Sequence, residues 1–83
     1  MQRTVEVYTV RGFTVEIASD SIFFTVRDEM DKPRGTIERP HLGVSQWRAY
    51  GRDGTDLGRC IGPRTALRLV ANDERKVFAQ QRI

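Results

Sequence analysis

The sequence predicts an α+β fold, in which one helix packs across a face of an antiparallel sheet of four to six strands. Three observations lead to this class. Three segments before residue 28 alternate apolar and polar residues with the period of a strand. A second hairpin follows, with its turn at Asp53-Gly54, and Gly62-Pro63 then supplies a helix start. The length of 83 residues and the 39% hydrophobic content fit one small domain over residues 1–83.

The N-terminal segments predict a three-stranded meander. Its strands cover residues 4–10, 13–18 and 22–27, where β-branched residues are frequent. Short polar turns connect them. The face that we expect to be buried consists of Val5, Val7, Phe13, Val15, Ile17, Ile22, Phe24 and Val26. On the opposite face, an exposed patch is expected from Tyr8, Val10 and Phe23, beside Arg11 and Arg27.

The longest connection is expected from Asp28 to Ser45. Its first part, residues 28–35, is the most polar stretch of the chain and contains a proline and a glycine, which predicts an exposed loop. Thr36–Arg39 is compatible with a short edge strand that Pro40 ends. Long connections on small domains are often functional or mobile, and both interpretations stay open for this one.

The second half of the chain predicts a hairpin and a helix. Trp47 and Ala49 alternate with Arg48 and Tyr50, which places the indole on the core side of a strand. A partner strand returns over residues 55–60. A helix is expected from about Pro63 to Ala71, with an apolar face that consists of Ala66, Leu67, Leu69 and Val70. Residues 74–82 then form a second helix or a final strand, and their composition favours the helix.

The chain offers little material for catalysis. Cys60 is the only cysteine and His41 the only histidine, so an internal disulfide and a multi-cysteine zinc site are excluded. His41 has no orienting partner at a recognisable spacing. We therefore expect a non-enzymatic protein without metal or cofactor. No run of about 18 apolar residues and no signal-peptide pattern is present, which predicts a cytoplasmic protein that has no membrane partner.

Arginine is the basic residue that dominates the composition. The net charge is +3, and twelve of the fourteen basic residues are arginines, whose planar guanidinium group suits phosphate recognition. Strand alternation places residues 48, 50 and 52 on one face, and a helix N-terminus is itself a phosphate site. Our leading hypothesis is therefore nucleic-acid (DNA) binding by Arg48, Tyr50, Arg52, Arg59 and Arg64.

A protein-interaction or inhibitor domain is the alternative. Its surface would be the aromatic patch around Tyr8 and Phe23, or the connection over residues 28–45, buried against a protein partner or a second copy of the chain. Such binding would respond weakly to salt, whereas nucleic-acid binding falls steeply as salt rises.

The spacing of Trp47, Asp53-Gly54, Gly58 and a helix bearing Ala66 and Leu69 resembles the amino-terminal arm-binding domain of phage-type tyrosine integrases. The resemblance covers residues 47–71. The sequence departs from the pattern of that family because a three-stranded meander precedes the motif and no catalytic domain follows it. The resemblance implies a phage-like protein whose sheet enters a DNA groove, with Arg48, Tyr50 and Arg52 on the reading strand.

Overall fold

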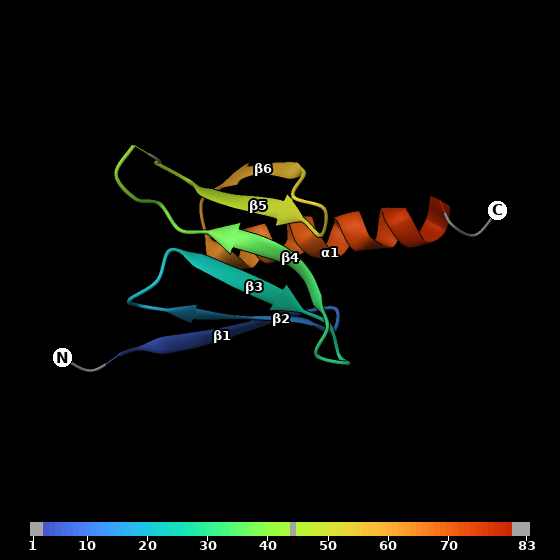
Figure 1. The fold of residues 1–83 in the computed structure, drawn as a ribbon, viewed down its shortest axis with the longest axis horizontal. Coiled ribbons are helices and arrows are strands. Elements are labelled where there is room, and N and C mark those ends of the chain that lie inside the picture. The colour runs from blue at the N-terminus through green and yellow to red at the C-terminus, as the bar shows by residue number, and fades with distance from the viewer. Residues whose placement is uncertain (1–2, 44, 81–83) are drawn as a thin grey trace.

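The structure is a computed structural model that describes residues 3–43 and 45–80. Its elements, in chain order, are β1 (Val5–Val10), β2 (Phe13–Ala18), β3 (Phe23–Arg27), β4 (Pro33–Glu38), β5 (Trp47–Gly51), β6 (Asp56–Cys60) and α1 (Pro63–Gln80). The six strands form one sheet in sequence order, and every neighbouring pair is antiparallel. Helix α1 lies across one face of this sheet (Figure 1). The predicted α+β fold is confirmed.

The core lies between α1 and the sheet. The helix contributes fully buried Leu67 and Val70, and the central strands contribute Val26 and Ile37. Gly35 of β4 allows the closest approach, because a Cβ atom there would lie 2.7 Å from Cγ1 of Val70. The helix face predicted from the apolar spacing is therefore the face that packs on the sheet.

The faces of β2 and β3 agree with the alternation in the sequence. Val15 and Ile17 of β2 are buried, as are Phe24 and Val26 of β3. Ile22, which was expected inside, is exposed because it precedes β3. The prediction for this residue was wrong because the strand begins one residue later.

The predicted face of β1 is wrong. Val7 is 61% exposed and Val5 is also exposed, whereas Tyr8 and Val10 pack against the core. In the register of the sheet, Tyr8 lies opposite buried Val15, so these two side chains share the helix-covered face. Alternation selected the more apolar set, but the mixed set with Tyr8 and Val10 is the one that packs against the core, so local apolarity did not decide the buried face.

The expected long connection contains an interior strand. Strand β4 lies between β3 and β5, so the predicted exposed loop over residues 28–35 and the predicted edge strand are both corrected. A tight turn explains the difference: Asp28 Oδ1 accepts hydrogen bonds from the backbone N–H groups of Met30 and Lys32, both at 2.9 Å. Asp31 adopts a positive φ of 62°, which completes the turn into β4.

Helix α1 is longer than predicted. It runs without interruption from Pro63 to Gln80, so the predicted end at Ala71 and the alternative of a final strand are both wrong. Asn72 and Asp73 were interpreted as a helix end and cap, but neither is a glycine or proline, and both are tolerated inside a helix. The rest of the predicted C-terminal segment, beyond Gln80, falls outside the described residues.

Candidate functional site

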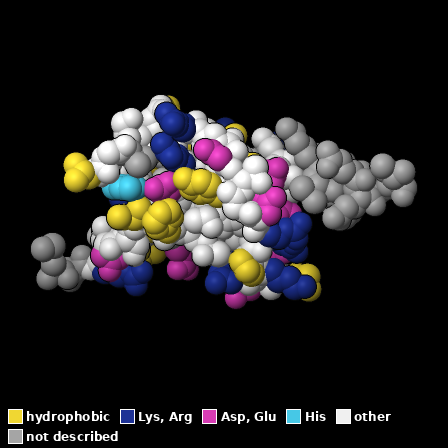
Figure 2. All heavy atoms as spheres, turned by 45° about the horizontal axis from the view of Figure 1, so that its top comes forward, with side chains coloured by type: hydrophobic (Ala, Val, Ile, Leu, Met, Phe, Trp, Pro, Cys, Tyr) yellow, Lys and Arg dark blue, Asp and Glu magenta, His cyan; other side chains and the backbone are white. Residues whose placement is uncertain are grey.

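The sheet face opposite α1 carries the candidate site. In the register of the strands, Phe23 lies opposite Glu38, Glu38 opposite Arg48, and Arg48 opposite Arg59. Directly opposed residues of antiparallel strands point to the same side, so these four side chains form one row across β3, β4, β5 and β6. We call this set the cross-strand row. Figure 2 shows hydrophobic, acidic and basic side chains close to the only histidine on this face of the molecule.

Glu38 is the centre of a hydrogen-bonded cluster. Its side chain is only 6% exposed, and it is the only buried charged residue in the described part of the chain. Tyr50 donates its hydroxyl to Oε1 at 2.6 Å, and His41 Nε2 lies 2.6 Å from Oε2. A carboxylate can only accept, so the His41 ring N–H is the donor. Both oxygens of Glu38 are thus satisfied from within the protein.

These contacts keep Glu38 ionised. The hydrogen bond from Tyr50, followed by that from His41, holds the pKa of the carboxyl below its ordinary value, although burial acts in the opposite direction. The same contact raises the pKa of Tyr50, because the phenol would lose a strong acceptor on ionisation. The cluster is therefore a buried carboxylate with one donor on each oxygen, the Tyr50 hydroxyl on Oε1 and the His41 ring N–H on Oε2.

Arg48 of β5 and Arg59 of β6 lie directly opposite each other in the register of the sheet. Arg59 is exposed, and the half-buried Arg48 has a buried Nε atom without a hydrogen-bond partner in the described structure. Neither guanidinium is within 4 Å of a carboxylate among the described residues, whereas Arg27 and Arg34 on the same face pair with Asp31 and Asp28. Arg48 also lies opposite Glu38 and adds Coulombic attraction to the hydrogen bonds that lower the pKa of that carboxyl. Two like charges directly opposite each other still destabilise a sheet, which favours an anion beside Arg48 and Arg59.

Three of the five residues in our nucleic-acid hypothesis share this face. Arg48 and Tyr50 lie on it together, as the alternation predicted, and the register of β6 against β5 adds Arg59. Arg52 does not, because β5 ends at Gly51 and the Arg52 Nε lies 3.5 Å from Oε1 of Glu74 on α1.

Arg64 is also separate from the open face. It lies in the first turn of α1, and its guanidinium sits over the ring of Tyr8, 5.5 Å from the centroid. Because Tyr8 belongs to the helix-covered side of β1, the structure divides the predicted basic set between two sides of the sheet.

The alternative aromatic patch is also divided. Tyr8 and Val10 face the helix, whereas Phe23 and Arg27 lie on the open face. Arg11 lies in the β1–β2 turn and donates a hydrogen bond to Asn72 Oδ1 on α1 at 2.7 Å. The predicted patch therefore does not form one surface.

The open face has apolar residues of its own. Exposed Val5 and Phe23 line an open trough of about 740 Å³ over the first three strands, and Val7 lies on the same face of β1. The trough also contains acidic side chains, among them Glu16 and Glu29.

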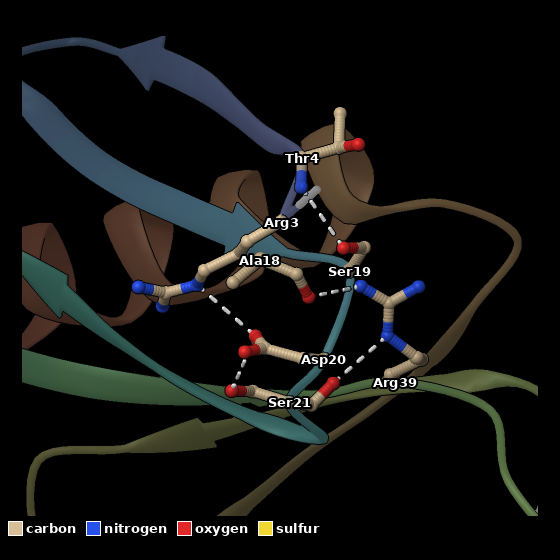
Figure 3. Close-up of polar contacts among 7 residues, drawn as sticks. All are labelled: Arg3, Thr4, Ala18, Ser19, Asp20, Ser21 and Arg39. Atoms are coloured by element: carbon tan, nitrogen blue, oxygen red, sulfur yellow. Dashed lines mark hydrogen bonds and ion pairs between the residues drawn. The ribbon is translucent and has the colours of Figure 1, made fainter. Parts of the chain in front are cut away.

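Two important residues, Glu38 and Arg39, carry no recognisable signal in the sequence. Glu38 was hidden in the expected connection, because its role depends on pairing with β5. Arg39, just after β4, donates to the carbonyl oxygens of Ala18 at 2.7 Å and Ser21 at 3.0 Å (Figure 3). Its guanidinium also lies over the rings of Phe24 and Trp47, at 5.4 and 5.5 Å from the centroids. This arginine therefore clamps the β2–β3 turn and has a structural role.

The comparisons with known proteins give no assignment. No family model matches the chain, and no curated protein or solved structure matches it either. Within the described ranges there is no group of three or more potential metal ligands. The described helix is not long and apolar enough to cross a membrane.

Proposed function

We propose that this protein binds nucleic acid through the open face of β4, β5 and β6. One observation carries the proposal: Arg48 and Arg59 are cross-strand neighbours on an uncovered sheet face, and neither forms an ion pair within the described structure. Arg27 and Arg34, by contrast, each form an ion pair with a nearby aspartate. A phosphate oxygen would relieve the repulsion between the two guanidinium groups and accept paired hydrogen bonds from them.

The neighbouring carboxylate does not block this surface. Glu38 lies next to Arg48 in the row, but it is 6% exposed and both of its oxygens accept hydrogen bonds from Tyr50 and His41. Arg59 is exposed and Arg48 is half-buried, so both are more accessible to a ligand than the buried Glu38. The net charge of +3 adds a general attraction for polyanions.

The test is a fluorescence anisotropy titration with labelled oligonucleotides at about 50 and 200 mM salt. Affinity should fall steeply between the two conditions, because each phosphate contact contributes about −0.7 to −0.9 to the slope of log K against log salt. Arg48→Ala and Arg59→Ala should each weaken binding to all sequences and reduce the magnitude of the slope by about 1.

Arg52→Ala is the matched control. It removes the same charge, but Arg52 faces Glu74 on the helix side, so it should leave binding nearly unchanged. Absence of binding at low salt, or an equal loss in all three variants, would contradict the proposed site. Thermal melts should accompany each titration so that loss of binding is not confused with loss of fold.

Protein interaction is a second candidate, and a specific observation favours it. Val7 is 61% exposed and Phe23 is 60% exposed on the open face, and β1 is an edge strand with unpaired backbone groups. Exposed apolar residues beside a free strand edge are a common site of association. Sedimentation analysis over a range of concentrations tests self-association, and a monomer at every concentration would argue against a homodimer.

A further inference from the structure

Phe23 is an aromatic residue that the core does not use. It is 60% exposed at the start of β3, while its neighbour Phe24 points to the opposite face and is buried against the core. An exposed phenyl ring on a flat sheet leaves apolar area in contact with water, and a flat ligand can cover it. Because Phe23 begins the cross-strand row that ends at Arg48 and Arg59, the ring and the two charges belong to one surface.

We propose that the nucleic acid bound on this face is single-stranded, with one unpaired base stacked on Phe23 and the adjoining backbone crossing β4 toward Arg48 and Arg59. This inference rests on the proposed nucleic-acid function. Bases that are not paired expose their faces to aromatic side chains, and a sheet that carries an aromatic ring and arginines is suited to hold them.

The spacing of the row fits this arrangement. Neighbouring strands lie about 4.8 Å apart, so Phe23 is about 10 Å from the position of Arg48 and about 14 Å from that of Arg59 across the sheet. Between Phe23 and Arg48 the row contains only Glu38, which is buried and hydrogen-bonded to His41 and Tyr50. An extended chain of nucleotides can therefore lie along the row.

The whole sheet is too wide to enter a groove of a duplex. Six strands at about 4.8 Å spacing make a sheet about 24 Å wide, twice the width of a major groove of about 12 Å. Only an edge ribbon such as β5 and β6 has the width to enter a groove. Phe23, two strands further in, would then contact no base, because the bases of a duplex are stacked on each other.

Acidic side chains limit the path on the other side of Phe23. The trough over β1, β2 and β3 contains Glu16 and Glu29, and its arginines Arg3 and Arg27 pair with Asp20 and Asp31. A phosphate backbone is repelled there and attracted toward Arg48 and Arg59. The charge distribution therefore directs the strand from Phe23 across β4 and not across β2.

The experiment compares one labelled oligonucleotide of about 12 nucleotides, within the usual range of about 4–16 for such sites, as a single strand and as its duplex. The single strand should bind more tightly to the full chain. Phe23→Ala should weaken single-strand binding about 5- to 150-fold, the range that base stacking on an aromatic ring produces, without changing the salt slope. Phe23→Tyr should retain the affinity, because the stacking face is kept.

Val7→Ala is the matched control, since it removes an exposed apolar side chain from the same sheet face but away from the row. It should leave binding unchanged, and Phe23→Ala should melt near the wild-type temperature because its ring lies outside the core. Tight duplex binding that needs Arg48 but not Phe23 would overturn the single-strand inference and leave the proposed function standing. Failure to bind either form would overturn both and favour a protein partner.

Discussion

Replacing Tyr50 by phenylalanine tests the cluster on the open face. The variant keeps the ring and removes the hydroxyl that donates to Glu38 Oε1 at 2.6 Å. A hydrogen bond to a charged group contributes about 1.5–3 kcal/mol, and the carboxylate it leaves unsatisfied is 6% exposed. We expect Tyr50→Phe to lower the free energy of unfolding by about 2 kcal/mol at pH 7. For a domain of this size, that corresponds to a fall in Tm of about 8–16 °C.

The loss of stability in Tyr50→Phe should depend on pH in a defined direction. The pKa of Glu38 is lowered in the folded state, chiefly by Tyr50, so its contribution to stability is present above the ordinary glutamate value of about 4.3 and is lost as the pH falls through the lowered value. The pKa of Tyr50 is raised, so its contribution is lost as the pH rises beyond about 10. The difference between wild type and variant should therefore be largest near neutral pH and shrink toward both extremes.

Urea denaturation followed by the fluorescence of Trp47 measures this difference. Tyr8→Phe is the matched control, because it also removes a tyrosine hydroxyl that donates to a glutamate, Glu6, but at an exposed site. Its effect should be much smaller. If both variants lost the same stability at pH 7, or if the loss in Tyr50→Phe persisted unchanged in acid, the role assigned to Glu38 would be refuted.

Two further changes test the packing and the arginine clamp. Gly35→Ala should lower the free energy of unfolding by about 1–3 kcal/mol, because the new Cβ would lie 2.7 Å from Val70 Cγ1. Gly62→Ser is the control and should be neutral or slightly stabilising, because no atom lies within 4 Å of a Cβ at that position. Equal melting temperatures for the two variants would contradict this prediction. Arg39→Lys should lower the free energy of unfolding in urea by about 1–3 kcal/mol, because lysine cannot bridge two carbonyls while it is stacked on two rings. The control Arg3→Lys, at an exposed site, should change it little. An unchanged stability in Arg39→Lys would contradict the structural role of Arg39.

The candidate site was only partly predictable from sequence. Alternation alone placed Arg48 and Tyr50 together on one strand face, and the Asp53-Gly54 turn brought Arg59 back beside them. Glu38 could not be found in this way, because its partners are defined by the register of β4 against β5. Arg52 was misplaced for a similar reason: the strand ends at Gly51, and the side chain finds Glu74, a residue far along the chain.

The local features of the fold could be predicted from the sequence, namely the alternating strands other than β4, the tight turns and the helix start at Gly62-Pro63, because each depends on neighbouring residues. The buried face of β1 and the interior position of β4 depend instead on packing and pairing between distant segments. In β1, the more apolar face with Val5 and Val7 is exposed, whereas the mixed face packs Tyr8 against the core, with Arg64 of α1 over the Tyr8 ring. The same long-range pairing gathers Phe23, Glu38 and Arg48 into one row, since residues far apart in sequence become neighbours only when the strands adopt a single register.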